Sequence, residues 1–139
     1  MTIKVEGAAP LIQVFDMPTS VAFYRDVLGF TIVSQSSPGD DFDWGWLRLG
    51  DAEVMLNTAY ESDSRPSTPD PRRIAAHADT ALYFGCRDVD GVYEYLRSRG
   101  IACEPPKNAP YGMRQLYLND PDGYVICFQW PVAAADRQT

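Results

Sequence analysis

Apolar and polar residues alternate in short stretches of this chain, and a helical pattern follows the first stretch. Residues 11–15 alternate as a strand does, and Pro18 suits the first turn of a helix that begins at residue 18 or 19. One face of this helix carries the apolar side chains Val21, Tyr24, Val27 and Leu28. Gly29 can end the helix in the left-handed conformation. The pattern predicts a strand followed by a helix.

Three further strands are expected after this helix. Residues 31–33 resume the extended pattern, and residues 44–49 and 53–56 each alternate with a period of two. The short Gly50-Asp51 connection between the last two runs is a hairpin signal. The first half therefore reads as one strand, one helix and three strands.

The same order of residues returns about 72 positions later. Residues 9–56 correspond to residues 81–128 in changed letters, and residues 53–56 correspond to residues 125–128. The repeat predicts a duplicated α+β fold. We expect two tandem βαβββ modules that form a curved, cup-shaped mixed sheet with helices on the outer face and a shared cavity.

The second half contains the matching elements. Residues 82–86 read as a strand, a helix capped near Asp88 ends at Gly100, and residues 114–118 and 124–130 form a closing hairpin. The apolar stripe of the helix consists of Val89, Val92, Tyr93 and Leu96.

Between the modules, the chain is polar and contains three prolines, so we expect a long surface connection that could reach another subunit. His77 lies there and is expected to be an exposed loop residue. The end of the chain is expected to be frayed. The predicted organisation is one domain over residues 1–139, with module 1 at about 8–57, a linker at 58–79, module 2 at about 80–131 and a tail at 132–139.

Composition excludes several classes of partner. The 139 residues are 45% hydrophobic and carry a formal charge of −7, which argues against nucleic acid or an anionic membrane surface as the main partner. No apolar run is long enough for a signal peptide or membrane span. Three cysteines without CxxC spacing suit a reducing cytoplasm, where buried thiols behave as small apolar groups.

Several segments together carry a resemblance to a known family. Residues 14–16 lead into the helix at 20–30, and residues 111–114, 119–123 and 126–128 resemble a closing hairpin. The chain resembles the vicinal oxygen chelate superfamily, the glyoxalase and bleomycin resistance group. This resemblance implies two strand-helix-three-strand modules. Because such proteins usually close their cups by pairing modules within a chain or across a dimer, we expect a homodimer.

The resemblance also locates where a metal would bind. Metal-using relatives place His, Gln or Glu at four inward positions, which here correspond to Ala9, Met55, Ala81 and Cys127. A catalytic zinc needs about three protein ligands, and alanines and a thioether cannot provide them. We therefore expect no metal and no cofactor. The Asp120-Pro121-Asp122-Gly123 segment is expected to form a tight turn with a structural role rather than to contact a ligand. Arg114 is expected to pair with a carboxylate.

Strand alternation selects the residues that would line the cavity. If Ala9 and Met55 point inward, every second side chain on the neighbouring strands shares that side. Leu47 and Leu49, matched with Leu116 and Leu118, then belong to the helix-covered face. The predicted ligand-binding residues are Gln13, Trp44, Trp46, Arg48, Glu53, Met55, Tyr83, Met113, Gln115, Tyr117 and Cys127.

An apolar and aromatic cavity of this kind favours binding of a small, flat aromatic ligand. The resemblance group includes metal-free proteins that sequester bleomycin-like drugs between two subunits, and this is the leading hypothesis. Acidic residues near the expected mouth would favour a cationic drug, namely Asp40, Asp41, Asp43 and Glu53.

Two alternatives remain open. The first is a metal-independent isomerase or lyase that acts on a small carbonyl or aromatic substrate, with Glu53 or Tyr117 as the acid or base. No catalytic triad is visible in the sequence, so binding without chemistry is favoured and no catalytic residue is assigned. The second alternative is an interacting protein whose cup is filled by its own side chains.

Overall fold

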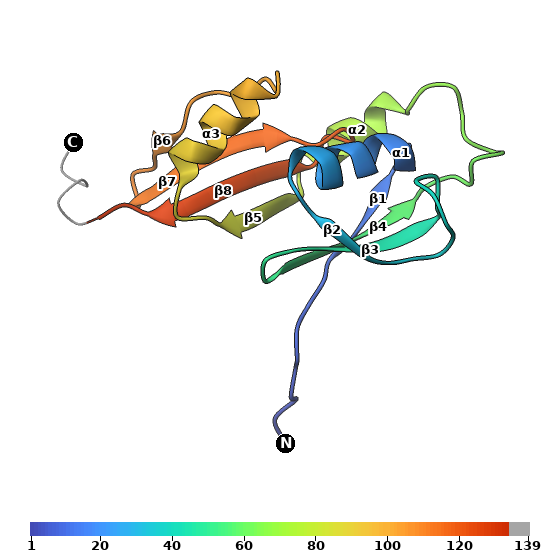
Figure 1. Ribbon diagram of the computed structural model, residues 1–139, viewed down its shortest axis with the longest axis horizontal. Coiled ribbons are helices and arrows are strands. Elements are labelled where there is room, and N and C mark those ends of the chain that lie inside the picture. The colour runs from blue at the N-terminus through green and yellow to red at the C-terminus, as the bar shows by residue number, and fades with distance from the viewer. Residues whose placement is uncertain (134–139) are drawn as a thin grey trace. The chain divides into compact units, whose positions relative to one another are not determined.

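The computed structural model describes residues 1–133, and the chain divides into two compact units (Figure 1). The first unit is Met1–Pro69, and the second begins at Asp70. Each unit contains one βαβββ module with a four-stranded sheet, so the predicted α+β class and the two modules are confirmed. Within residues 1–133, no helix has the length and apolar character needed to cross a membrane.

In the first unit, the strand order is β1-β4-β3-β2, with β1 parallel to β4 and the other pairs antiparallel. Alternate strand residues such as Val14, Leu47, Val54 and Leu56 are fully buried on the helix-covered face. The elements are β1 (Leu11–Val14), α1 (Met17–Val21), η1 (Ala22–Val27), β2 (Thr31–Gln35), β3 (Trp44–Leu49) and β4 (Ala52–Thr58).

The first helix begins one or two residues earlier than predicted and changes geometry halfway. Asp16 caps it, because its side chain accepts a hydrogen bond of 3.1 Å from the backbone N–H of Thr19. The second half is a π-helix, in which the Leu28 N–H donates to the Phe23 carbonyl at 3.0 Å. Gly29, with φ of 92°, ends the helix as predicted. The sequence pattern did not distinguish the π-helical turn from α-helix.

In the second unit, the strand order is β5-β8-β7-β6, with β5 parallel to β8. Asp88 caps α3 by accepting a 2.9 Å hydrogen bond from the Gly91 N–H, and Gly100 follows the helix with φ of 73°. The elements are α2 (Pro71–His77), β5 (Ala81–Gly85), α3 (Val89–Ser98), β6 (Lys107–Asn108), β7 (Met113–Asn119) and β8 (Val125–Pro131).

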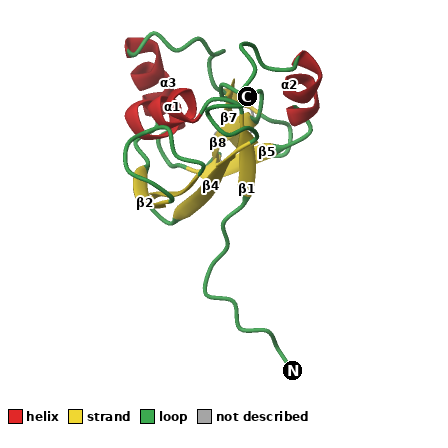
Figure 2. Cartoon of the chain, turned by 90° about the vertical axis from the view of Figure 1, so that its right-hand side faces the viewer, coloured by secondary structure: helices red, strands yellow, loops and turns green. Residues whose placement is uncertain are grey.

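The polar connection between the modules is not wholly loop, because it contains the helix α2 (Figure 2). The prediction for His77 was wrong: its ring stacks on Tyr124 with centroids 4.1 Å apart, and its Nδ1 lies 2.7 Å from the Asp122 carbonyl oxygen. Gly123 allows a close approach here, since a Cβ on it would lie 2.6 Å from the Ile74 carbonyl oxygen. The Asp-Pro-Asp-Gly turn therefore also packs against α2. The turn preferences of its residues did not indicate this contact.

The prediction of a frayed tail over residues 132–139 was wrong for its first residue. Val132 is buried, and its N–H donates to the Gly112 carbonyl oxygen at 2.9 Å. The part of this prediction that concerns residues 134–139 lies outside the described residues.

The strand registers confirm the repeat and refine its spacing. Leu11 pairs with Met55 in the first module, and Tyr83 pairs with Cys127 in the second, which reproduces the shift of 72. In the third strand of each module, however, Trp46 is opposite Met55 and Tyr117 is opposite Cys127, so the shift there is 71. The extra residue lies in the longer turn of the second hairpin.

This shift corrects the predicted match between leucines. Leu47 corresponds to Leu118, while Leu116 corresponds to Gly45. A Cβ on Gly45 would lie 2.5 Å from Cε2 of Phe42, whose ring occupies the space over the glycine. In the first module, this packing position is therefore filled by Phe42, which lies in the loop before the strand. In the second module, the same position is filled by Leu116, which lies in the strand itself.

Candidate ligand-binding site

The uncovered face of the first sheet brings together several residues selected by strand alternation. The Asn57 amide donates to Oε1 of Gln13 at 3.2 Å, and the Trp46 indole N–H donates to Oε2 of Glu53 at 3.1 Å. Arg48 also contacts Glu53, with Nη2 3.0 Å from Oε1. These contacts place β1, β3 and β4 side chains on one face, whereas Trp44 shares that face by alternation alone.

A pocket of about 430 Å³ opens on this face, and we call it the first pocket. Its walls combine strand side chains with part of the N-terminal segment. The lining residues are Glu6, Gly7, Ala8, Ala9, Trp46, Arg48, Glu53 and Met55. The sequence analysis missed Glu6, Gly7 and Ala8, because this short stretch has no period that indicates burial or binding.

The first pocket combines apolar walls with a polar group of fixed position. Trp46 and Met55 supply an indole ring and a thioether. Glu53 retains only 21% of its side-chain exposure, and both its carboxylate oxygens accept hydrogen bonds from Trp46 and Arg48. Charge-assisted hydrogen bonds of this kind hold a carboxylate in one orientation. The pocket therefore offers a ring surface next to an oriented ion pair.

In the second module, two tyrosines and a cysteine form a row across β5, β8 and β7. The hydroxyl oxygens of Tyr83 and Tyr117 lie 3.1 Å apart, and their rings meet edge to face at 6.2 Å between centroids. Cys127 is opposite both tyrosines in the strand register and is buried. This row therefore presents phenol rings on the uncovered face.

The surroundings of Tyr117 and Cys127 favour the neutral forms of both groups. The hydrogen bond with Tyr83, followed by burial, holds the pKa of Tyr117 well above its usual range. Burial also raises the pKa of the Cys127 thiol. At neutral pH, a protonated phenol and a protonated thiol can donate hydrogen bonds, but they are poor bases and poor metal ligands.

Gln115 occupies a buried polar position beside this row. Its Nε2 donates to Oε1 of Gln129 at 2.9 Å, and its Oε1 accepts from the Tyr111 hydroxyl at 3.0 Å. Its amide is thus engaged within the module. Met113, at the start of β7, is half-buried.

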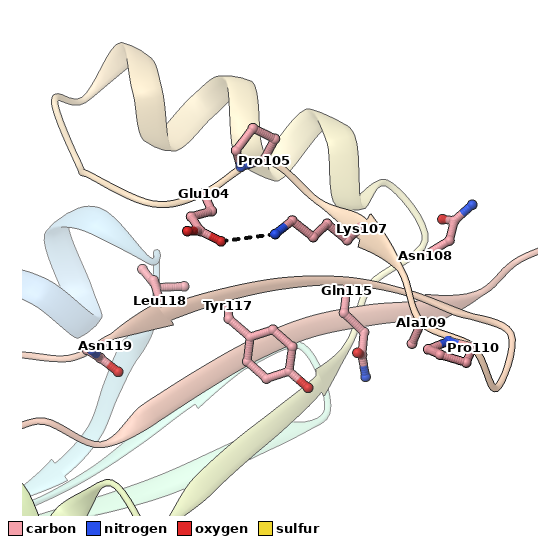
Figure 3. Close-up of a pocket in the computed structure, with 10 residues that line it drawn as sticks. All are labelled: Glu104, Pro105, Lys107, Asn108, Ala109, Pro110, Gln115, Tyr117, Leu118 and Asn119. Carbon is pink, nitrogen blue, oxygen red and sulfur yellow. Dashed lines mark hydrogen bonds and ion pairs between the residues drawn. The ribbon is translucent and has the colours of Figure 1, made fainter.

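A second pocket, of about 480 Å³, lies along β7 (Figure 3). Tyr117 and Gln115 point to one side of the strand, and the ion pair between Glu104 and Lys107, at 3.3 Å, lies on the other. The lining residues are Glu104, Pro105, Lys107, Asn108, Ala109, Pro110, Gln115, Tyr117, Leu118 and Asn119. Apart from Gln115 and Tyr117, none of these residues was among the predicted site residues.

The positions that correspond to metal ligands in relatives do not fit a metal site. Ala9 precedes β1 rather than lying in it, and Ala81 offers no donor atom. Met55 offers only a thioether, and burial keeps the Cys127 thiol protonated. Over residues 1–133, no three His, Cys, Asp or Glu side chains gather as a metal site requires.

The acids that were expected near the mouth of the cavity are engaged in ion pairs. Asp40 pairs with Arg25 at 3.0 Å, and Asp41 pairs with Arg65 at 3.0 Å. Glu53, which lines the first pocket, is paired with Arg48. Three of the four acids therefore have an arginine partner, but Arg25 also pairs with Asp26 and Arg65 also pairs with Asp16. Arg114, as expected, pairs with a carboxylate, Asp90, at 2.7 Å.

The fold and the residues over both modules agree with one family model. The model for the Glyoxalase/Bleomycin resistance protein/Dioxygenase superfamily matches residues 8–128. The chain therefore belongs to this superfamily, which confirms the resemblance inferred from the sequence segments.

Three individual proteins illustrate the similarity of the chain to known sequences and structures. The chain is 33% identical over 113 residues to the uncharacterized protein YaeR of Escherichia coli K12, covering 80% of this chain and 84% of YaeR. It resembles TnmS3, an antibiotic binding protein from Streptomyces sp. CB03234, with 27% identity, a TM-score of 0.64 and coverage of 94% and 98%. A bleomycin-binding protein solved with bleomycin shares the fold, at 21% identity, a TM-score of 0.68 and coverage of 90% and 98%.

Proposed function

We propose that this protein binds a small, flat aromatic ligand in a metal-free first pocket and holds it without chemical change. The supporting observation is the placement of the Trp46 ring beside the oriented Arg48–Glu53 pair, in a pocket that Ala9 and Met55 also line. Sequestration of an antibiotic fits this arrangement, and TnmS3 is described as antibiotic binding.

The dimensions and walls of the pocket suit such a ligand. Its volume of about 430 Å³ lies within the range of roughly 300–1,000 Å³ typical of small-molecule sites. A ring stacked on Trp46 gains about 0.5–1.5 kcal/mol beyond the burial of its area. Burial of the ligand on Met55 and Ala9 adds apolar contact, so micromolar binding, about −8 kcal/mol, is within reach.

The ion pair in the pocket determines which ligands fit best. Glu53 is already paired, so it attracts a cation less strongly than an unpaired carboxylate would. A polar substituent on the ligand can still bond to the edge of this pair. We therefore favour an uncharged aromatic ligand with one or two hydrogen-bonding groups.

The proposed assembly is a homodimer. Large side chains remain exposed on the uncovered faces of both sheets: Leu11 at 46%, Tyr83 at 53% and Tyr117 at 42%. Exposed apolar and aromatic surface of this kind is typical of contact regions. Light scattering should return about twice the 15.5 kDa of one chain, and a monomer mass would contradict the dimer.

The alternative of a metal-independent isomerase or lyase depends on Glu53 or Tyr117 as the base. Glu53 does line the pocket, which supports this alternative, but both its oxygens are engaged by Trp46 and Arg48. The raised pKa of Tyr117 keeps its phenol neutral. Both residues are therefore better suited to orient a ligand than to remove its proton.

Tryptophan fluorescence tests the proposal directly. The protein is titrated with bleomycin, mitomycin and intercalating quinoxalines, and at least one should quench the emission to saturation. Trp46→Phe should weaken that binding about tenfold, through loss of indole stacking and of the bond to Glu53. Trp130→Phe is the control, because Trp130 stacks with Arg87 in the other module. No response to any of the compounds would remove this proposal.

A further inference from the structure

Three polar side chains of the second module form a hydrogen-bond chain that begins in the turn before β7 and crosses the uncovered face. The Tyr111 hydroxyl donates to Oε1 of Gln115 at 3.0 Å, and Nε2 of Gln115 donates to Oε1 of Gln129 at 2.9 Å. Gln115 is held most firmly, because it is only 7% exposed. Both ends of its amide are bonded, so the amide cannot turn over unless the whole chain reverses.

The direction of this chain is set at Tyr111. A carbonyl oxygen can only accept, so the Tyr111 hydroxyl is the donor in its contact with Gln115. The nitrogen of Gln115 then faces Gln129, which turns its own amide oxygen toward that nitrogen. Within residues 1–133, Nε2 of Gln129 has no hydrogen-bond partner, and this atom is not buried. The chain therefore ends in a donor that is open to solvent.

The neighbouring strand leaves space beside this donor. Gly85 of β5 is opposite Gln129 in the strand register and is exposed, so no β5 side chain covers the amide. A Cβ on Gly85 would lie 3.6 Å from the Trp130 ring, which is an ordinary contact. Packing against Trp130 therefore does not require a glycine at this position, and the space is open to a ligand.

The tyrosine pair supplies a second donor on the same face. Tyr117 lies on the same side of β7 as Gln115 (Figure 3), and its hydroxyl oxygen is 3.1 Å from that of Tyr83. This contact is the largest cause of the raised pKa of Tyr117, as expected where Tyr117 is the donor. The hydroxyl hydrogen of Tyr83, which is 53% exposed, then remains available to a ligand.

The arrangement of the two donors indicates which chemical group they recognise. Gln129 is opposite Gly85 and not Tyr83, so the donors are two positions apart along the sheet, about 7 Å in an extended chain. The oxygens beside them already accept hydrogen bonds: Oε1 of Gln129 from Gln115, and the Tyr83 hydroxyl from Tyr117. This face therefore matches acceptor oxygens on two edges of a ring and disfavours amino groups, which would set donor against donor.

We propose that the uncovered face of the second module binds the carbonyl oxygens of a flat aromatic ligand through Gln129 and Tyr83, and that Tyr111 is the positioning residue that orients the Gln129 amide. This inference goes beyond the proposed function, because it adds a binding surface in the other module and names the group that this surface recognises. It rests on the proposed function only for the flat aromatic shape of the ligand.

Nuclear magnetic resonance of the ligand-free protein tests the hydrogen-bond chain itself. The Nε2 protons of Gln115 should show nuclear Overhauser cross-peaks to the Gln129 side chain and none to the Tyr111 ring. Cross-peaks to the Tyr111 ring would mean that the chain runs in the opposite direction. Gln129 would then offer its oxygen to the ligand, and the proposal would be overturned.

Calorimetric titration with anthraquinone-2-sulfonate and anthracene-2-sulfonate tests the recognition of carbonyl oxygens. The two probes have the same ring system and charge and differ only in two carbonyl oxygens. The first should bind about tenfold more tightly, through two hydrogen bonds, and should shift the Gln129 side-chain resonance. Gln129→Glu turns the free donor into an acceptor and should abolish this preference. Asn108→Asp adds the same charge on β6, keeps the oxygen that Arg114 contacts, and should leave the preference.

Two further variants test the positioning residue and the space beside the donor. Tyr111→Phe should weaken anthraquinone-2-sulfonate more than anthracene-2-sulfonate, so that the preference falls to about threefold or less, an effect that a purely structural role would not have. Gly85→Leu, which fills the space beside Gln129, should weaken the binding of both probes. Equal affinity of the wild type for both probes, equal loss of preference in Gln129→Glu and Asn108→Asp, or an unchanged preference in Tyr111→Phe would each overturn the proposal.

The first pocket is read separately, from the fluorescence of Trp46. Quenching of Trp46 by a ligand, together with equal affinity for the two probes, would overturn only the carbonyl-binding surface of the second module. A carbonyl preference that depends on Gln129, with no response of Trp46 to any compound, would overturn only the proposal for the first pocket.

Discussion

The two modules have the same order of strands and helix, but they fill equivalent packing positions with different side chains. Each begins its helix with an aspartate cap, and each pairs its first and last strands in the same register. The first module covers its third strand with β2 and packs Phe42 over Gly45. The second module has only the short β6 and a leucine at the matching position. The comparison shows that the shared register constrains the strands, while loops and edge strands determine which surface stays open.

The largest expected effect concerns the packing that distinguishes the modules. Phe42→Ala should lower the free energy of unfolding by about 3–5 kcal/mol, because the ring is 1% exposed and covers Gly45. Gly45→Leu alone should also destabilise, by about 1–3 kcal/mol, through collision with that ring. The double variant, which imitates Leu116, should be more stable than the sum of the two single effects predicts, as measured by urea unfolding. Additive effects would break the comparison.

The contact between α2 and the turn at Gly123 gives the next largest expected effect on stability. Gly123→Ala should cost about 2–3 kcal/mol, because φ is 86° and the new Cβ would lie 2.6 Å from the Ile74 carbonyl oxygen. Gly100→Ala is the matched control, since φ is 73° and nothing lies within 4 Å of the new Cβ, so only about 1 kcal/mol should be lost. Equal losses in thermal unfolding would mean that α2 is not seated on this turn.

The helix caps of the two modules, Asp16 and Asp88, can be compared through smaller effects on stability. Asp88→Ala should cost about 1 kcal/mol, the typical value for a lost cap. Asp16→Ala should cost about 2 kcal/mol, because Asp16 also pairs with the half-buried Arg65 at 2.8 Å. Arg65 keeps Asp41 as a partner in this variant, so Arg65→Met tests the reason: it should cost less stability in the Asp16→Ala background than in the wild type, because one of its two ion pairs is already lost. A larger cost for Asp88→Ala would contradict this account.

The smallest effect is a pH dependence confined to the second module. The pKa of Tyr117 is raised in the folded state, so its contribution to stability is present below the unfolded pKa of about 10 and is lost as pH rises above it. Ultraviolet titration should show Tyr117 ionising above the usual tyrosine pKa of about 10. Tyr83→Phe removes the largest cause and should bring this ionisation to lower pH, and an unchanged titration would contradict the contact.

Much of the fold followed from the sequence, because strand alternation and the repeat both depend on local periodicity. The shift of 72 correctly paired Met55 with Cys127, and alternation correctly separated buried Leu47 from half-buried Trp46. The predicted match of Leu47 with Leu116 failed because one extra turn residue changes the register of a single strand. A periodic pattern cannot reveal such an insertion until the hairpin pairing is known.

The site was less predictable than the fold. The N-terminal wall of the first pocket and the short β6 depend on where irregular segments run, and such segments have no period. The arginine partners of Asp40 and Asp41 lie 15 and 24 residues away in the sequence, so the spacing of charged residues did not reveal these ion pairs. His77 was expected to be exposed because its stacking partner, Tyr124, is distant in sequence.

The most direct test of the central claim isolates one tryptophan. The chain has three, and Trp44→Phe with Trp130→Phe leaves Trp46 as the only reporter of the first pocket. The variant is titrated with the wild type's quenching ligand before and after a chelator wash. The account predicts saturable quenching of Trp46 with the same midpoint in both samples. Quenching that disappears after the wash and returns with one equivalent of a transition metal would contradict it.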